Sequence, residues 1–275
     1  MLINFSKMHG LGNDFVVIDA INQSIDLSEE QIKWMADRHY GIGFDQLLLV
    51  REARSAADFR YVIYNADGSE VSQCGNGARC FALFVKQKGL TDKNSIRVET
   101  AAGELVLDIN EGKLVTVNMG EPRFLPDTIP LLSEQQQQLY SVEVGGETIE
   151  FSALSMGNPH AIIQVDNIET AAVESLGAAL ESHTLFPERV NVGFSEITGP
   201  STIKLRVFER GAGETLACGS GACAAVVAAI RLAKVVSPVS VELPGGTLSI
   251  DWQGDGYPVK MTGPATFIFD GMIRL

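Results

Sequence analysis

The chain has 275 residues, of which 45 % are hydrophobic and 20 % are charged, and its formal net charge is −13. This length allows one large domain or two medium-sized domains, and the composition is that of a globular protein rather than a disordered one. The excess of acidic residues argues against nucleic acid or an anionic membrane surface as the main partner.

The sequence carries no sign of export or membrane insertion. Residues 1–7 lack the charged segment and the apolar run of a signal peptide. The longest apolar run, Ala222 to Ile230, is too short to span a bilayer. We therefore expect a cytoplasmic protein, in which the four cysteines are thiols rather than disulfides.

The cysteines do not have the spacing of a metal site. They occur as Cys74-x5-Cys80 and Cys218-x4-Cys223, and none of the four histidines lies at a ligand-like interval from a cysteine. A structural zinc site is therefore not expected.

The first half of the chain predicts strands on either side of one helix. Residues 59–64 alternate as a strand does, and a glycine-containing turn follows them. A helix is predicted to begin at Cys74 and to end near Gly89, a natural C-terminal cap. Further strands are predicted at residues 96–98 and from Gly103, and residues 117–120 close the unit.

The same order of elements recurs 144 residues later. Residues 74–78 read Cys-Gly-Asn-Gly-Ala, and residues 218–222 read Cys-Gly-Ser-Gly-Ala. A predicted strand at residues 203–208 precedes the second motif, and an apolar helix-like run at 222–230 follows it. A short strand at 239–241 and a second one from Gly246 come next, and residues 260–263 close the unit. The sequence therefore predicts an internal duplication.

Polar residues keep register in the two copies as well. Measured back from the two cysteines, Asn13 matches Asn158, Gln46 matches Asn191 and Asn65 matches Glu209. An old duplication without functional meaning would explain the matching strands, but it explains the matching polar positions less well. Polar residues at strand ends and turns more often indicate a shared pocket.

Residues outside the two copies suggest how the halves are joined. Residues 121–140 contain three prolines and four consecutive glutamines, the composition of a surface connection. The last twelve residues follow the second copy, and the alternation of Phe267 and Phe269 predicts a strand that crosses back to complete the first half. We predict an α+β fold with an N-terminal half of residues 1–118 plus 264–275 and a C-terminal half of residues 119–263.

The position of the repeated cysteines suggests proton chemistry. At a helix N-terminus, unpaired N–H groups and the helix dipole favour a thiolate, and the following glycines let a carboxylate approach the backbone. If both helices face one cleft, Cys74 could take a proton from one face of a carbon while Cys218 returns one to the other, or the reverse. Such an inversion needs no cofactor.

The other candidate residues differ in the roles that their positions indicate. Cys80 and Cys223 lie among apolar neighbours, where cysteine usually packs as a small hydrophobic residue. His160 lies within a repeated segment, so it is either a structural residue or one that biases which sulfur carries the proton. The carboxylate of Glu209 could bias the position of the proton in the same way. Arg210 has no basic counterpart in the first half, so it either binds one end of a substrate or forms a surface ion pair.

Several segments resemble diaminopimelate epimerase, and the resemblance extends from residue 3 to residue 275. The matching segments are residues 8–15, 65–69, 74–80, 156–160, 209–211 and 214–221. The resemblance implies two similar α+β halves, each a curved sheet around a central helix, with the active site in the cleft between them. It also implies interconversion of LL- and meso-2,6-diaminopimelate, for lysine and peptidoglycan synthesis, without pyridoxal phosphate or metal.

The resemblance assigns roles to individual residues. It implies that Cys74 and Cys218 are the acid/base pair and that His160 and Glu209 modulate it. The residues that it implies as substrate contacts are Asn13, Gln46, Asn65, Gly75, Asn76, Asn158, Asn191, Glu209, Arg210, Gly219 and Ser220. The family is usually homodimeric, and Phe269 occupies an interface position where tyrosine is expected.

Two other functions remain open at this stage. The same scaffold serves proline or hydroxyproline epimerases and phenazine-type isomerases, since a fold alone does not determine the substrate. A compact proline would hardly need so many scattered polar contacts, whereas a long substrate with a second amino-acid end would. A non-catalytic amino-acid-binding protein or a thiol-redox protein is the second alternative.

Overall fold

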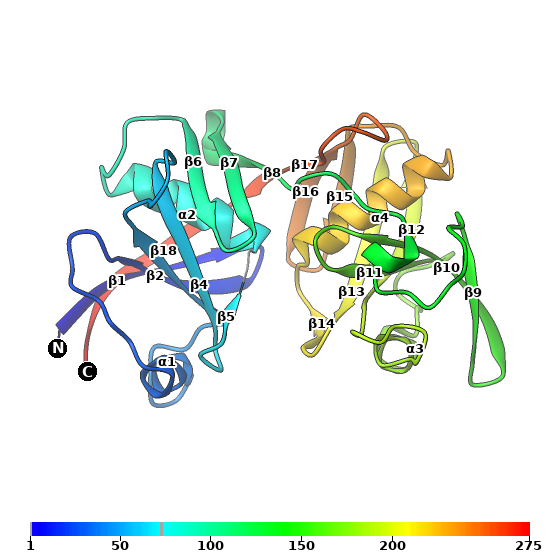
Figure 1. The fold of residues 1–275 in the computed structure, drawn as a ribbon, viewed down its shortest axis with the longest axis horizontal. Helices are drawn as coiled ribbons and strands as arrows, with labels where there is room; N and C mark the ends of the chain where they lie inside the picture. The colour runs from blue at the N-terminus through cyan, green and yellow to red at the C-terminus, as the bar shows by residue number, and fades with distance from the viewer. Residues whose placement is uncertain (1, 72–73) are drawn as a thin grey trace. The chain divides into compact units, whose positions relative to one another are not determined.

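The structure is a computed structural model that describes residues 2–71 and 74–275. The chain forms two compact units (Figure 1). The first unit comprises Met1–Asn118 and Thr262–Leu275, and the second unit comprises Met119–Met261. Both contain a sheet and helices, so the predicted α+β class with two similar halves is confirmed.

The elements of the first unit follow one another as strands interrupted by two helices. They are β1 (Leu2–Gly10), β2 (Asn13–Asp19), α1 (Glu29–Ala36), β3 (Gln46–Arg51), β4 (Phe59–Asn65), β5 (Glu70–Val71), α2 (Gly75–Gln87), β6 (Ser95–Thr100), β7 (Gly103–Ile109), the 3₁₀ turn η1 (Glu111–Lys113), β8 (Leu114–Asn118) and, at the end of the chain, β18 (Thr266–Arg274).

The second unit repeats this order. Its elements are the 3₁₀ turn η2 (Pro126–Thr128), β9 (Tyr140–Val144), β10 (Glu147–Ser155), β11 (Pro159–Gln164), α3 (Val173–Glu181), β12 (Asn191–Gly199), β13 (Thr202–Glu209), β14 (Gly213–Thr215), α4 (Gly219–Arg231), β15 (Val239–Leu243) and β16 (Gly246–Asp251), followed by β17 (Lys260–Pro264) at the boundary between the units.

The pairing of the strands makes the duplication visible in three dimensions. In the first unit β2 is parallel to β3, β3 is antiparallel to β4, and β4 is parallel to β6. In the second unit β11 is parallel to β12, β12 is antiparallel to β13, and β13 is parallel to β15. Each parallel pair is joined by a crossover that contains a helix, as parallel connections require.

Each unit wraps its sheet around one apolar helix. Helix α2 contacts β1, β2, β3, β7 and β8, and α4 contacts β10 to β13, β15 and β16. The opposite face of the first sheet packs on α1, where Val16, Leu47 and Leu49 lie in one core cluster with Ile32. Both faces of these strands are therefore buried, which explains their continuous apolar runs.

The C-terminal strand belongs to the first unit. Strand β18 pairs antiparallel with β1, and Phe5 lies opposite Gly271. Figure 1 shows this pairing as a red strand beside the blue N-terminal strand. The alternation of Phe267 and Phe269 therefore marks a strand, as predicted from the sequence.

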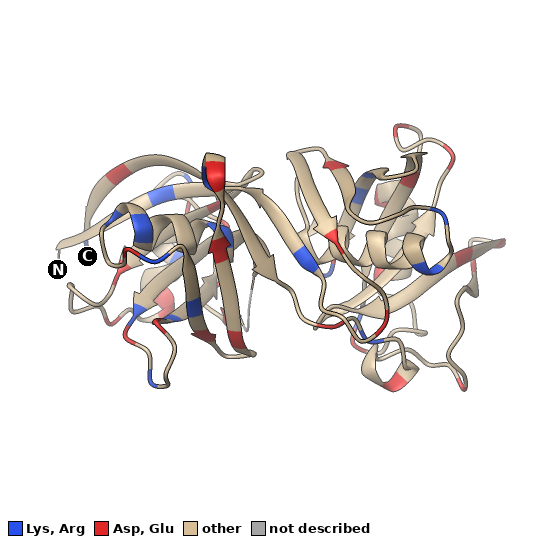
Figure 2. Cartoon of the chain, turned by 90° about the horizontal axis from the view of Figure 1, so that it is seen from above, with Lys and Arg blue, Asp and Glu red and all other residues tan. Residues whose placement is uncertain are grey.

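Charged side chains are scattered over both units. Figure 2 shows Lys and Arg interspersed with the more numerous Asp and Glu on strands and loops. No helix among the residues that the structure describes is long and apolar enough to cross a membrane.

Candidate functional site

In the first unit, three of the predicted site residues lie at one edge of the sheet. Asn13 begins β2, Gln46 begins β3 and Asn65 ends β4. Gln46 lies opposite Asn65 in the antiparallel ladder, and its Nε2 donates to Asn65 Oδ1 at 3.0 Å. Gln46 Oε1 is buried and has no hydrogen-bond partner in the structure, so an acceptor is left for a further donor.

Cys74 lies at the same edge, as the N-cap of α2. Its carbonyl oxygen accepts the first helical hydrogen bond from Ala78 N at 2.9 Å and a second one from the Tyr61 hydroxyl at 3.2 Å. A Cβ at Gly77 would overlap this hydroxyl oxygen, so only glycine fits there. The motif therefore seats the helix start closely against β4. Gly75, the first helical residue, is the N-terminal backbone donor expected to face an anion.

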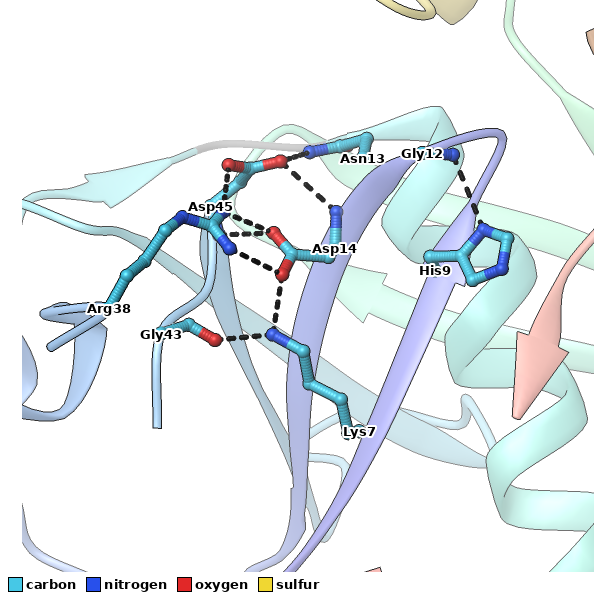
Figure 3. A network of polar contacts seen from close by, with 8 residues as sticks. All are labelled: Lys7, His9, Gly12, Asn13, Asp14, Arg38, Gly43 and Asp45. Carbon is cyan, nitrogen blue, oxygen red and sulfur yellow. Dashed lines mark hydrogen bonds and ion pairs between the residues drawn. The ribbon is translucent and has the colours of Figure 1, made fainter. Parts of the chain in front are cut away.

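The thiol of Cys74 faces a fixed asparagine. Its Sγ lies 3.9 Å from Asn13 Oδ1, while Asn13 Nδ2 donates to Asp45 Oδ2 at 2.9 Å. Figure 3 shows that Asp45 and Asp14 share Arg38, whose Nη2 lies 2.9 Å and 2.8 Å from their respective Oδ1 atoms. Asn13 is thus tied to a charged network.

Asp14 is the centre of this network. It also accepts from Lys7 Nζ at 2.5 Å, and Lys7 donates to Gly43 O as well (Figure 3). Burial opposes ionisation of Asp14, but the hydrogen bonds that Asp14 accepts from Arg38 and Lys7 outweigh the effect of burial. They lower the pKa of Asp14 to about 2. His9 Nδ1 accepts from Gly12 N at 3.3 Å and holds the β1–β2 turn.

In the second unit the cysteine has a carboxylate partner. Cys218 is the N-cap of α4, and its thiol lies 3.1 Å from Glu209 Oε2 and 3.7 Å from Ser220 Oγ. Thr215 Oγ1 donates to the other carboxylate oxygen of Glu209 at 2.5 Å. Glu209 ends β13, opposite Gly213 of β14, so the hairpin presents the carboxylate to the start of α4.

The surroundings of Cys218 favour its protonated form, whereas the sequence left open which cysteine is the thiolate. Its position at a helix N-terminus favours a thiolate, but burial and the charge of Glu209 raise the pKa of Cys218 well above its usual value. Its side chain is only 4 % exposed, so the helix terminus and Ser220 do not offset the loss of water. Cys218 is therefore a thiol at neutral pH, bonded to an acceptor.

His160 contacts an asparagine. Its Nε2 lies 3.0 Å from Asn158 Oδ1, and Asn158 Nδ2 donates to Ser220 Oγ at 3.3 Å. The imidazole is fully buried, and burial, with a smaller effect of Arg210, lowers its pKa to about 3. The neutral ring is linked to Ser220, a neighbour of the Cys218 thiol, through Asn158, and its Nδ1 is buried without a partner in the structure.

Asn191 and Arg210 are joined through the backbone. Asn191 Nδ2 donates to Pro159 O at 2.9 Å, and its Oδ1 accepts from Arg210 N at 3.0 Å. The Arg210 guanidinium donates to Glu188 O at 3.0 Å, so it is held by a carbonyl and not by a carboxylate in this contact. Gly219 is the first residue of α4 and matches Gly75.

The remaining two cysteines are packed in the helices. Cys80 and Cys223 are both fully buried and neither forms a disulfide, and burial raises the pKa of Cys80 to about 12. Phe269, the expected interface residue, lies on β18 with its side chain 47 % exposed and its ring against Phe5 at a centroid distance of 6.1 Å.

Four residues near the two cysteines were not singled out from the sequence: Asp45, Tyr61, Arg79 and Thr215. Asp45 directly precedes Gln46, and Thr215 lies within the segment 214–221 that carried the resemblance, so proximity to the motifs was a signal for both. Tyr61 reads as an ordinary strand residue, and only its contact with Cys74 distinguishes it.

Comparison with known proteins identifies the family. The model of the diaminopimelate epimerase family matches residues 5–125 and 152–268. Similar solved structures include a phenazine biosynthesis protein of the PhzF family from Bacillus anthracis, with 18 % identity, a TM-score of 0.70 and all of both chains covered.

A hydroxyproline epimerase from Agrobacterium vitis, solved with bound trans-4-hydroxy-L-proline, is similar as well. It has 16 % identity and a TM-score of 0.69, and the match covers 99 % of this chain and 92 % of that one. At such low identity the solved structures establish a shared fold, one used by epimerases and isomerases. The family match, with a cysteine at the N-cap of both central helices, shows that this chain belongs to the diaminopimelate epimerase family.

Proposed function

We propose that this protein interconverts LL- and meso-2,6-diaminopimelate without a cofactor, by proton transfer with Cys74 and Cys218. The observation that carries the proposal is the Cys218 thiol at 3.1 Å from Glu209 Oε2, at a helix start that matches the helix start of Cys74. A two-base inversion needs one sulfur that holds a proton and one that can accept a proton.

The pKa of Cys218 assigns the resting roles in this proposal. Since its pKa is raised, Cys218 carries the proton and donates it to the planar carbanion. Cys74 is the base that removes the α-proton in that direction. In the reverse direction Cys218 must be the base, and the nearby Glu209 carboxylate is the acceptor through which it can lose its own proton. The backbone N–H groups at the helix starts suit the substrate α-carboxylate.

Residues that do not match in the repeat support a long substrate. Asn65 corresponds to Glu209, and Arg210 has no basic counterpart, so the two halves offer different polar groups. Diaminopimelate has a reacting and a non-reacting amino-acid end, which must be distinguished. A compact imino acid such as proline gives these side chains less to bind. Because the site hydrogen-bonds polar ends, analogues that lack them should be rejected strongly.

The deciding experiment follows deuterium from solvent. We expect LL-diaminopimelate incubated with the protein in heavy water to gain deuterium at the inverted α-carbon, as measured by proton NMR. Cys74→Ala and Cys218→Ala should each abolish inversion, because each removes one of the two bases. Cys223→Ala, a change in the same helix as Cys218, is the control and should retain activity.

Three outcomes would reject the proposal. Turnover of L-proline alone would place the protein with the imino-acid epimerases. Retention of function in both Cys74→Ala and Cys218→Ala would favour a binding protein, and cycling of the two thiols through a disulfide during turnover would favour a redox protein.

We also propose that the protein is a cytoplasmic homodimer in which β18 forms part of the interface. Ile268, Phe269 and Met272 on this strand are 49 %, 47 % and 68 % exposed. Exposed apolar side chains in a cluster commonly mark an interface. Light scattering coupled to size exclusion should give the mass of a dimer, and Phe269→Asp should lower it toward that of the monomer.

A further inference from the structure

Two side-chain amides of the first unit lie in a hydrogen-bond chain that runs in one direction. Arg79 Nη2 donates to Asn76 Oδ1 at 2.9 Å, and Asn76 Nδ2 donates to Asn13 Oδ1 at 3.4 Å. Asn13 Nδ2 then donates to Asp45 Oδ2 at 2.9 Å. The chain thus connects a guanidinium inside the core with a carboxylate at the sheet edge.

The chemistry of the two end residues sets this direction. A guanidinium can only donate and an ionised carboxylate can only accept, whereas an asparagine amide does either according to how it is turned. Arg79 is fully buried, and Gly10 makes room for it, because a Cβ there would lie 3.1 Å from Arg79 Nη2. At the other end, Arg38 Nη2 donates to Asp45 Oδ1 at 2.9 Å and fixes the carboxylate.

We propose that Asp45 and Arg79 are positioning residues that hold Asn13 and Asn76 in one amide orientation, so that Asn13 presents Oδ1 to Cys74 and to a hydrogen-bond donor of the substrate. The ammonium group of an amino acid is such a donor. This inference rests on the proposed function for the identity of the substrate, but not for the orientation of the amides.

The second unit has no counterpart to the two end residues. In the register of the repeat, Val190 matches Asp45 and Cys223 matches Arg79, and neither offers a charged end. There Asn158, which matches Asn13, places its Oδ1 3.0 Å from His160 and donates from Nδ2 to Ser220. The matching asparagines therefore turn opposite ends toward their helix starts, an acceptor in the first unit and a donor in the second.

The test turns the amide of Asn13 with one isosteric change at the carboxylate end of the chain. In Asp45→Asn a single carbonyl oxygen replaces two carboxylate oxygens. We expect the charged guanidinium of Arg38 to keep this oxygen, since a charge-assisted hydrogen bond is stronger than the one from Asp14 N, which now donates to Asp45 Oδ2 at 3.1 Å. The new NH₂ group then faces Asn13 and favours the turned amide, whose N–H groups face the Cys74 sulfur and which gives up the long 3.4 Å bond from Asn76 Nδ2. In the double variant Arg38→Met with Asp45→Asn, the carbonyl oxygen is free to accept from Asn13 again.

Two readouts follow from the reversal. We expect kcat/KM of Asp45→Asn for LL-diaminopimelate to fall by roughly tenfold to a hundredfold, because a group in the site is misplaced. We expect iodoacetamide to alkylate Cys74 at neutral pH roughly fivefold faster, since N–H groups favour a thiolate. Mass spectrometry of the peptide that contains Cys74 measures the second readout.

The double variant and a matched control decide the inference. We expect the double variant to return both readouts toward wild type, which the loss of a merely structural ion pair would not do. Asp58→Asn also removes a carboxylate that binds a basic side chain and a backbone N–H in the first unit, and both readouts should stay at wild-type values. The inference is overturned if Asp45→Asn matches Asp58→Asn in both readouts, or if the double variant lies no closer to wild type than Asp45→Asn. A wild-type protein inactive on diaminopimelate would reject the proposed function, and alkylation would still test the orientation.

Discussion

The sulfur of Cys218 lies 3.1 Å from Oε2 of Glu209, at the start of a helix whose N-terminal N–H groups would otherwise favour a thiolate. The burial of the thiol and, next to it, the carboxylate prevail, and the pKa of Cys218 rises. This pair therefore keeps a proton at a position where the helix alone would release it.

Glu209→Gln should make Cys218 more reactive and the enzyme less active. Loss of the negative charge lowers the pKa of Cys218, so more thiolate is present at neutral pH and alkylation of its peptide becomes faster. Loss of the proton acceptor should lower kcat by at least about a hundredfold, the usual contribution of an acid/base group. Glu214→Gln, which breaks the ion pair with Arg206 on the same hairpin, is the control. Unchanged alkylation of Cys218 in Glu209→Gln would contradict the assignment of the pKa shift to Glu209.

Thr215 should matter through Glu209. Its hydroxyl donates to Glu209 Oε1 at 2.5 Å and orients Oε2 toward Cys218. Thr215→Val keeps the shape and removes the donor, so kcat should fall by about threefold to tenfold, in line with about 1 kcal/mol for one hydrogen bond. Thr215→Ser keeps the hydroxyl and should retain most of the activity. Equal loss in both variants would point to packing instead.

Gly77→Ala should destabilise the first unit. The new methyl group would overlap the Tyr61 hydroxyl, and relief of such a clash typically costs about 1–3 kcal/mol of unfolding free energy. Tyr61→Phe removes that oxygen, so the same glycine substitution should cost less in the Phe background. Urea denaturation of the four proteins measures the difference, and an equal cost in both backgrounds would exclude the clash as the cause.

His160 should make stability fall at mildly acidic pH. Its pKa is about 3 in the folded protein and near 6.5 in the unfolded chain, so between these values the unfolded state binds the extra proton. The free energy of unfolding should thus decrease as pH falls below 6.5, by up to about 1.4 kcal/mol per pH unit. His160→Gln should remove this slope, whereas the exposed His39→Gln should keep it. Asp14, with a pKa of about 2, lowers the free energy of unfolding further only when the pH falls below 3.8, the ordinary pKa of this side chain.

Much of the local structure followed from the spacing of residues. The two Cys-Gly-x-Gly-Ala motifs predicted helix starts, and the structure places both cysteines at N-caps. The alternation at residues 59–64 and 203–208 predicted β4 and β13. These features depend on local periodicity and on glycine, which act over a few residues and can be read along the chain.

Contacts between distant segments could not be read in this way. Nothing in the sequence says that His160 contacts Asn158 rather than a cysteine, because the direction of a side chain depends on the packing around it. Which of the two cysteines carries the proton could not be read along the chain either, since the helix termini were visible in the sequence while the burial of the Cys218 thiol was not. The partners of Asn13, at positions 45 and 76, likewise come together only when the strands pair.

The sequence by itself determined that the chain is built twice, that each copy begins a helix with a cysteine, and which polar residues match. The repeat and the positions of the glycines can be read from local spacing along the chain. Only the tertiary structure decided what each cysteine faces, an asparagine amide at Cys74 and a glutamate carboxylate at Cys218. The physical reason is that acidity and amide orientation depend on burial and on partners from other strands, which folding alone brings within hydrogen-bond distance.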